Sequence, residues 1–139
     1  MIRARLADAD ALFALVEQFA TSYRPLRALF DVHLPVLLEA PRTDLRVAIE
    51  HGDVVGYSLA FDLLTLFANG VVTELQELMV APEQRGRGIG RMLVESVIAD
   101  ARARGVVEIT VPTRRAAEFY KRLGFEGTAL YFKRRVSRG

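Results

Sequence analysis

The sequence predicts a single-domain α/β (α+β) protein in which helices cover the faces of a sheet. Its 139 residues, 51% of them hydrophobic and 26% charged, suffice for a buried core without disulfides or structural metals. Segments with the two-residue alternation of strands and segments with the spacing of amphipathic helices follow one another along the chain. We expect the order strand, helix, helix, three strands, helix, strand, helix, strand, within one domain spanning residues 1–139.

The N-terminal segment is expected to contain one strand and two helices. Residues 2–6 predict the short strand, and Asp8 is a suitable N-cap for a helix that runs to about Phe19. The apolar face of this helix would consist of Leu12, Phe13, Val16 and Phe19. Pro25 suits the first turn of a second helix, which we expect to be interrupted near Pro35.

A change of period marks the middle of the chain. Residues 45–50 are typical of a strand, and after a turn at 51–53 large residues alternate with small ones. The large residues are Val55, Tyr57, Leu59 and Phe61, and those between them are Gly56, Ser58, Ala60 and Asp62. This pattern predicts a strand with one crowded face and one face of small residues. Asn69-Gly70 predicts a hairpin turn, with residues 71–80 as the returning strand.

The C-terminal part is expected to hold a glycine loop followed by a helix, a strand, a second helix and a last strand. Pro82 ends the preceding strand because it has no amide to donate. The first helix would run to about Arg104. Its buried residues, spaced by four, would be Ile89, Leu93, Val97 and Ala101. Residues 106–111 predict a strand, residues 114–123 a short helix, and residues 125–136 a terminal strand or hairpin.

The composition excludes several kinds of site. The chain has no cysteine, which excludes disulfides, thiolate metal sites and a cysteine nucleophile. With only His33 and His51, we expect no zinc site and no other metal. Asp8 stands where the apolar core of a secretory signal would begin. Asp62 interrupts the longest apolar stretch, which we interpret as buried strands rather than a membrane span. We therefore expect a soluble, cytoplasmic protein.

The segment from Arg85 to Arg91 alternates glycines with arginines and leads into a predicted helix. Glycines let the backbone approach a ligand closely, and free amides at a helix N-terminus bind anions. A Walker loop is excluded because no Gly-Lys-Ser/Thr is present, and a dinucleotide fingerprint fails because its third glycine would fall on Arg91. We predict a phosphate or pyrophosphate site, with a glycine turn that serves only packing as the alternative.

Charge is distributed in a way that agrees with such a site. Residues 1–84 carry 6 arginines and 12 acidic residues, giving −6, and residues 85–139 carry 13 basic and 5 acidic residues, giving +8. The basic half suggests an anionic ligand. On charge alone, a solvated basic surface is the alternative interpretation.

Two motifs resemble the GNAT superfamily of N-acetyltransferases. Motif A of that family, Gln/Arg-x-x-Gly-x-Gly/Ala, is matched by Arg85, Gly88 and Gly90. Residues 116–125 resemble motif B of the family. Tyr120 in this segment lies thirty residues after Gly90, which is the usual separation of the two motifs in the family. Residues 2–12 are similar to the start of the family, more weakly. The family often has asparagine where this chain has Thr113, so the resemblance does not supply that contact.

The resemblance implies a mixed, mainly antiparallel central sheet flanked by helices, with two splayed central strands. Acetyl-CoA would lie in the gap between the strand that ends at Val80 and the strand that ends at Val111. Its pantetheine arm would pair with backbone groups of Leu78, Met79 and Val80. Its pyrophosphate would be bound by Arg85, Gly86, Arg87, Gly88, Ile89, Gly90 and Arg91.

The resemblance also implies catalytic roles. Tyr120 occupies the position of the family's acid, which lies beside the cofactor sulfur and protonates the leaving thiolate; a core tyrosine is the alternative. Met79 offers a backbone amide to the oxyanion that develops during acyl transfer. The base that accepts the amine proton would be Glu77, Glu108 or no dedicated residue.

These features predict an acetyl-CoA-dependent N-acetyltransferase that acts by direct transfer to a primary amine, on a small molecule or a peptide, in a ternary complex. A catalytically idle CoA-binding regulatory module of the same fold is the first alternative. A nucleic-acid-binding module is the second, with Arg114, Arg115, Arg122, Lys133, Arg134 and Arg135 as its candidate contacts. We expect no nucleic-acid or membrane partner, whereas a homodimer would agree with the family.

The acidic N-terminal half favours a cationic acceptor, because the family builds its acceptor side largely from that half. The acidic residues in question are Asp31, Glu39, Glu74, Glu77 and Glu83. A cleft lined by one sign of charge concentrates ligands of the opposite sign. If these acids are scattered over solvent-facing strand ends, the preference disappears.

Overall fold

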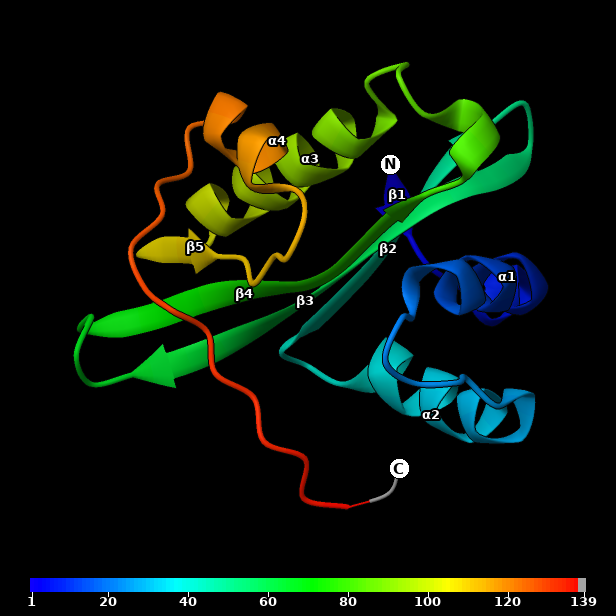
Figure 1. Cartoon of the computed structure of the whole chain (residues 1–139), viewed down its shortest axis with the longest axis horizontal. Coiled ribbons are helices and arrows are strands. Elements are labelled where there is room, and N and C mark those ends of the chain that lie inside the picture. The colour runs from blue at the N-terminus through cyan, green and yellow to red at the C-terminus, as the bar shows by residue number, and fades with distance from the viewer. Residues whose placement is uncertain (138–139) are drawn as a thin grey trace.

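The computed structural model describes residues 1–137 and contains a five-stranded sheet in the order β1-β2-β3-β4-β5. The elements are β1 (Ile2–Arg3), η1 (Leu6–Asp8), α1 (Ala9–Phe19), α2 (Arg27–Glu39), β2 (Thr43–Glu50), β3 (Asp53–Thr65), β4 (Gly70–Val80), η2 (Pro82–Gln84), α3 (Ile89–Ala103), β5 (Glu108–Thr110) and α4 (Ala117–Arg122). Neighbouring strands are antiparallel except β4 and β5, which are parallel. α1 and α2 cover one face, and α3 and α4 the other (Figure 1). The predicted fold class is confirmed.

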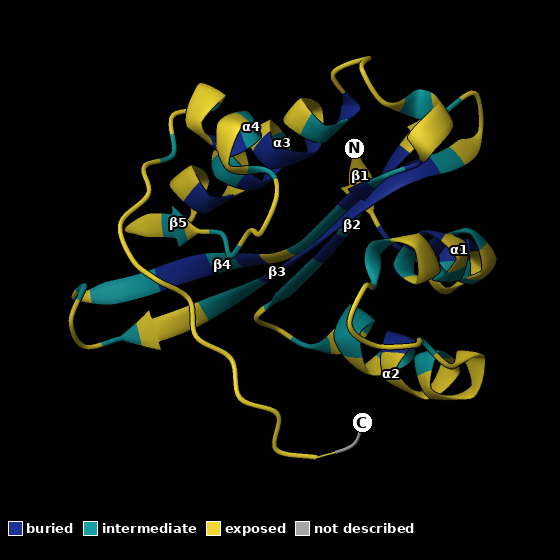
Figure 2. Cartoon of the chain, viewed as in Figure 1, coloured by how far each residue is buried: buried dark blue, intermediate teal, exposed yellow. Residues whose placement is uncertain are grey.

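The hairpin of β3 and β4 carries the core on both of its faces (Figure 2). Asn69 adopts a φ of 58° at the predicted turn. Tyr57 and Leu59 pack in the cluster that includes the buried leucines of α1 and α2. On the other face, α3 approaches so closely that a Cβ added at Gly56 would lie 3.3 Å from Leu93 Cδ1. The predicted crowded and small-residue faces are both present.

One residue of the predicted alternation faces the other way. Ala48 pairs with Gly56 and Ile49 with Val54, so Val55 is an extra residue opposite β2. Such a β-bulge breaks the two-residue alternation. Val55 therefore packs with Ile89 and Leu93 of α3 rather than with Tyr57 and Leu59.

The predicted interruption of the second helix at Pro35 is wrong. α2 is continuous from Arg27 to Glu39 with Pro35 inside it. Proline removes the amide that would bond to the carbonyl of Asp31, but Asp31 is exposed, so water can take the place of that amide. Among residues 1–137, no helix has the length and apolar character that crossing a membrane requires.

The predicted terminal strand over residues 125–136 is also wrong. Residues 125–137 form no helix or strand and instead cross the molecule toward α2 (Figure 1). Phe125 packs against Tyr120, but Leu130 and Phe132 are 83% and 86% exposed. Gly127 and the three consecutive cations from residue 133 make the segment a poor strand former. β5 therefore lies at the edge of the sheet within the described residues, not at its centre.

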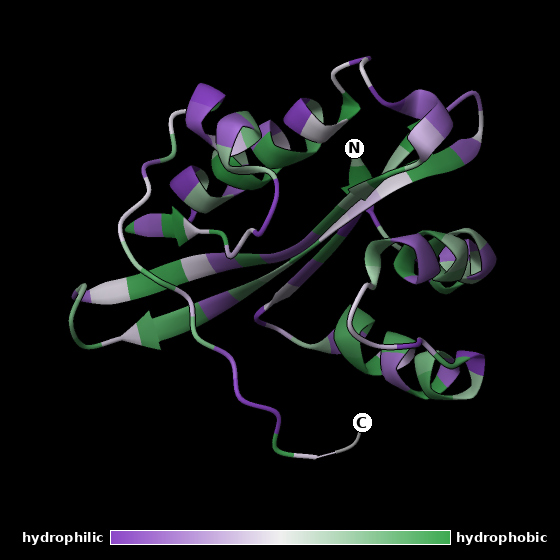
Figure 3. Cartoon of the chain, viewed as in Figure 1, coloured by the Kyte–Doolittle hydropathy of each residue, from purple (hydrophilic) through white to green (hydrophobic). Residues whose placement is uncertain are grey.

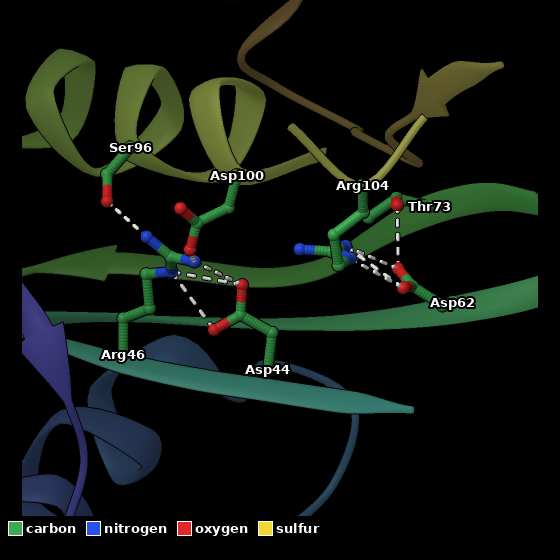
Figure 4. A network of polar contacts seen from close by, with 7 residues as sticks. All are labelled: Asp44, Arg46, Asp62, Thr73, Ser96, Asp100 and Arg104. Atoms are coloured by element: carbon green, nitrogen blue, oxygen red, sulfur yellow. Dashed lines mark hydrogen bonds and ion pairs between the residues drawn. The ribbon is translucent and has the colours of Figure 1, made fainter. Parts of the chain in front are cut away.

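Two arginine networks attach α3 to the sheet (Figure 4). Arg46 of β2 forms ion pairs with Asp44, 2.9 Å away, and with Asp100 of α3, and it donates to Ser96 of α3. After the last residue of α3, Arg104 pairs with Asp62 of β3, which also accepts a hydrogen bond from Thr73 of β4 at 2.7 Å. Because these pairs join the second half of the helix to three strands, they fix the position of α3 against the sheet.

Arg46→Ala should lower the free energy of unfolding by about 2–4 kcal/mol, because it leaves the half-buried Asp44 without its partner. The matched control is Arg91→Ala, whose pair with Glu95 on the same helix is exposed and should contribute less than about 1 kcal/mol. Urea unfolding of both variants tests this. Equal midpoints would show that the network adds nothing beyond a surface pair.

Candidate functional site

β4 loses its partner strand halfway along its length. Its parallel pairing with β5 covers only Val72, Thr73 and Glu74. The rest of β4, residues 75–80, continues without a strand on that side, while its other side stays paired with β3. One edge of this part of β4 therefore offers unpaired backbone amides and carbonyls, as sheet edges do. The opening lies between the two strands that the sequence predicted to splay.

A β-bulge at the start of this opening turns Glu77 toward the α1 and α2 face. Leu59 pairs with Glu77 and Ala60 with Leu75, so Gln76 is an extra residue in β4. Without a bulge, residues 75 and 77 would share a face. Instead, Leu75 packs with the α3 cluster, and Glu77 lies beside Leu59 on the opposite face. Bulges next to active sites often redirect a side chain in this way.

Glu77 lines a cavity of about 470 Å³ between α1, α2 and the sheet. The hydroxyl of buried Tyr57 donates a hydrogen bond to Glu77 Oε1 at 2.7 Å. Burial raises the pKa of Glu77, and the bond from Tyr57 opposes this rise only in part. Burial and the charge of Glu77 likewise raise the pKa of Tyr57, which stays protonated as a donor. A carboxylate with a raised pKa is a better base toward an amine.

The glycine loop has the backbone geometry that an anion site requires. Gly86 and Gly88 both adopt a φ of 80°, the left-handed region, and a Cβ added at either would meet no atom within 4 Å. The first amide of α3 to find a helical acceptor is that of Met92, bonded to the carbonyl of Gly88. The amides before it lack such partners, as at every helix start. The loop therefore fits a pyrophosphate, and it could hold one.

The arginines of the loop have partners within the protein. Arg85 donates to the carbonyl of Val80 at 3.2 Å. Arg87 is paired with Glu50, at the end of β2, and Arg91 with Glu95 at 3.5 Å. The structure therefore directs Arg87 toward β2 rather than toward the opening beside β4. Backbone amides, more than these side chains, are therefore the candidate ligands for an anion at this loop.

Tyr120 lies in the cluster between α3, α4 and the sheet. It is 6% exposed and packs edge-on against Phe119 and Phe125, with ring centres 5.0 and 5.5 Å away. Burial raises its pKa to about 12, so the phenol remains protonated and able to donate a proton at neutral pH. Tyr120 packs in the cluster that contains Leu75, where the unpaired part of β4 begins, whereas Glu77 lies on the opposite face of the sheet.

The structure does not bring Glu108 together with Glu77. Glu108 pairs with Val72 in register, five residues or about 17 Å along the strand from Glu77. It is exposed on the edge strand, where a charge needs no special explanation. Thr113 is engaged locally, since its hydroxyl accepts a hydrogen bond from the amide of Ala116 at 3.0 Å.

Sequence reasoning missed Tyr57 and the cavity. Tyr57 was expected only as a core residue, and its partnership with Glu77 depends on the bulge, which no local pattern announces. His33, to which the sequence assigned no role, also lines the cavity. The cavity needs α1 and α2 docked against β2 and β3, a long-range arrangement.

Comparisons with known proteins identify the family of this chain. The model of the acetyltransferase (GNAT) domain matches residues 41–127, which include the glycine loop and Tyr120. An uncharacterized N-acetyltransferase of Chlorobaculum tepidum is 34% identical over 137 residues, covering 97% of this chain and 81% of the relative. The aminoalkylphosphonate N-acetyltransferase of Salmonella typhimurium is 29% identical over 129 residues, covering 90% of this chain and 83% of the relative.

A solved structure shows the same fold. The aminoglycoside N-acetyltransferase AAC(6')-Iy in complex with CoA has a TM-score of 0.83 to this chain at 18% identity, covering 97% of this chain and 93% of that one. At that identity the likeness concerns the fold alone. The domain match over more than half of the chain and the Chlorobaculum relative over nearly all of it show the family: this chain belongs to the GNAT acetyltransferases.

Proposed function

We propose that the protein transfers the acetyl group of acetyl-CoA directly to a primary amine in a ternary complex. The observation that carries the proposal is the opening beside residues 75–80 of β4, which has the glycine loop at one end and Glu77 turned away to the acceptor side. A strand-like pantetheine arm suits an open strand edge, and the amides of residues 86–91 suit its pyrophosphate. Acetyl-CoA would supply an activated acetyl group with a thiolate as leaving group.

Two residues of the chain then carry out the two proton transfers of the reaction, one from the amine and one to the thiolate. An amine attacks only when neutral, and Glu77, with its raised pKa, accepts the amine proton. Tyr57 holds Glu77 Oε1 in place through its hydroxyl. Tyr120 gives its proton to the departing thiolate, and the backbone amide of Met79 is our candidate donor to the oxyanion. Glu108 is not part of this proposal because it lies outside the opening.

Release of free thiol from acetyl-CoA tests the function. A panel of primary amines is mixed with the protein, and thiol and acetylated amine are measured together. Equal amounts of both products show that the acetyl group passes to the amine and not to water, and an initial-rate pattern that intersects rather than runs parallel when both substrates are varied supports direct transfer over an acetyl-enzyme. If the protein binds CoA in a calorimeter but no amine is acetylated, the idle regulatory module of the same fold replaces the enzyme. Strongly salt-dependent binding to DNA would instead favour the nucleic-acid module.

The charge of the acceptor is proposed from Glu77 alone. Of the five acids expected to attract a cationic acceptor, Glu77 lies on the cavity, and Asp31 is paired with Arg27 at 2.8 Å. We therefore propose an acceptor that is cationic at its reacting amine. The kcat/KM of the enzyme for such an acceptor should fall with added salt. An unchanged kcat/KM in salt would reject it. A cytoplasmic location and a homodimer remain predictions.

Glu77→Gln should lower turnover by about 10²–10⁴-fold and raise stability at neutral pH. The folded protein raises the pKa of this carboxyl, so its ionised form opposes folding above that pKa and ceases to do so as the pH falls. The amide keeps an oxygen for the bond from Tyr57 but carries no charge. Thermal unfolding at pH 5 and pH 8 should show a larger gain at the higher pH, and equal turnover would remove Glu77 as the base.

A further inference from the structure

The cavity beside Glu77 is mainly apolar. Ten of its fifteen lining residues are leucine, valine, proline or phenylalanine. They include Leu12 of α1, Leu29 and Phe30 of α2, Leu45 of β2 and Leu59 of β3. The volume of about 470 Å³ is that of a site for a small molecule, for which about 300–1,000 Å³ is usual. Burial of hydrocarbon is therefore the main interaction that this cavity offers.

The cavity has one acidic residue and a basic rim. Glu77 is the only carboxylate among the lining residues, and Arg24, which is exposed and also lines the cavity, has no acidic partner within residues 1–137. Tyr23 also lines the cavity, and the Arg135 guanidinium and Lys133 Nζ lie 4.5 and 5.7 Å from the centre of its ring. A ligand with one positive charge can pair with Glu77. A second positive charge would meet the cations of the rim.

The wall of the cavity formed by α2 is apolar out to the solvent. Leu26 and Leu29 line the cavity and yet are 52% and 53% exposed. In Figure 3, hydrophobic stretches alternate with hydrophilic ones along α2. A polar ligand would leave these side chains in contact with water, whereas a hydrocarbon group would cover them.

We propose that the acceptor is an apolar monoamine, an alkylamine or arylalkylamine whose amino group meets Glu77 and whose hydrocarbon body fills this cavity. The inference rests on the proposed function, since it places the acceptor beside the opening of β4. Each methylene buried contributes about a fourfold gain in binding. Amino sugars, polyamines and amino acids would instead leave polar groups without partners against leucine and phenylalanine.

A matched acceptor series tests the inference. We expect kcat/KM to rise about fourfold per methylene from ethylamine to hexylamine, until the cavity is filled. Two compounds of the same length place a charge at the far end: 6-aminohexanoate and 1,6-diaminohexane. Both should be at least about tenfold poorer than hexylamine, with the diamine the poorer because of Arg24. A flat chain-length profile, or a preference for either charged compound or for an amino sugar, overturns the inference.

Two substitutions on α2 locate the effect. Leu29→Asn changes a half-exposed residue of the cavity wall, and Val32→Asn changes a similarly exposed residue of the same helix that does not line the cavity. We expect Leu29→Asn to raise the KM for hexylamine about three- to tenfold with the KM for acetyl-CoA unchanged, and Val32→Asn to change neither. Equal effects of the two substitutions would remove the cavity as the binding site.

Direct binding separates this inference from the proposed function. Hexylamine is titrated calorimetrically into the protein saturated with CoA, so that no turnover is needed. Binding that weakens in Leu29→Asn and not in Val32→Asn supports the cavity assignment even if no amine is acetylated, in which case the proposed function fails by itself. Acetylation of other amines without any binding of hexylamine overturns the inference and leaves the enzyme in place.

Discussion

Tyr120→Phe is expected to lower turnover by about 10²–10⁴-fold while leaving the affinity for acetyl-CoA unchanged. Phenylalanine keeps the edge-on contacts with Phe119 and Phe125, so the core around α4 is preserved. The substitution removes only the hydroxyl that we propose as proton donor to the departing thiolate, and general-acid catalysis contributes an effect of this size. Turnover under saturating substrates and calorimetric affinity for CoA measure the two quantities separately.

Tyr131→Phe is the matched control, because it removes the same hydroxyl from a side chain that is 69% exposed and lies outside the site. It should change neither quantity. If Tyr120→Phe turns over at the rate of the unsubstituted protein, Tyr120 is a core residue and another group, or water, protonates the thiolate.

The pH dependence of turnover follows from the same groups. With a pKa of about 12, the phenol of Tyr120 stays protonated through pH 9, so we expect no fall in rate from loss of the acid. The raised pKa of Glu77 moves the acidic limb of the profile to higher pH than an ordinary carboxylate would. In Tyr120→Phe the limb should stay in place while the whole profile falls.

The parts of the fold that follow from local pattern were predictable. The alternation predicted from Val55, the Asn69 turn and the four-residue spacing from Ile89 each depend on residues near one another in sequence. The structure confirms the turn and the spacing, and it confirms the alternation except at Val55, which the bulge turns to the other face. A prediction that depended on contacts with a distant part of the chain was wrong. A strand over residues 125–136 requires an edge that accepts it, and the three-residue β5 does not.

The candidate site divides in the same way. The backbone geometry of the glycine loop could be predicted because it depends on the glycines of the loop itself, and Gly86 and Gly88 both adopt a positive φ. The position of Glu77 could not, because the bulge at Gln76 decides which face of the sheet it joins. Without that bulge, Glu77 would face α3, and Tyr57 would lack its carboxylate partner. Thus sequence motifs define the cofactor side, whereas strand register defines the acceptor side.

Gly88→Asp is expected to abolish measurable binding of acetyl-CoA in a protein that remains folded. Gly88 is the N-cap of α3, with a φ of 80° and open space where a Cβ would lie. Aspartate tolerates the left-handed region better than most residues and interacts favourably with the helix dipole, but a side chain at this φ is still strained. Thermal unfolding of the variant therefore has to show that it is folded before its binding is measured.

The expected loss has an electrostatic cause. A carboxylate placed about 4 Å from a pyrophosphate charge costs about 4 kcal/mol at an effective dielectric constant of 20, which corresponds to about a thousandfold weaker binding. Gly105→Asp is the control, since Gly105 has a φ of 75° and equally open space at the far end of α3. Calorimetric affinity for CoA should be unchanged in Gly105→Asp. A folded Gly88→Asp protein with unchanged affinity would show that the glycine loop is a packing turn and that the pyrophosphate binds elsewhere.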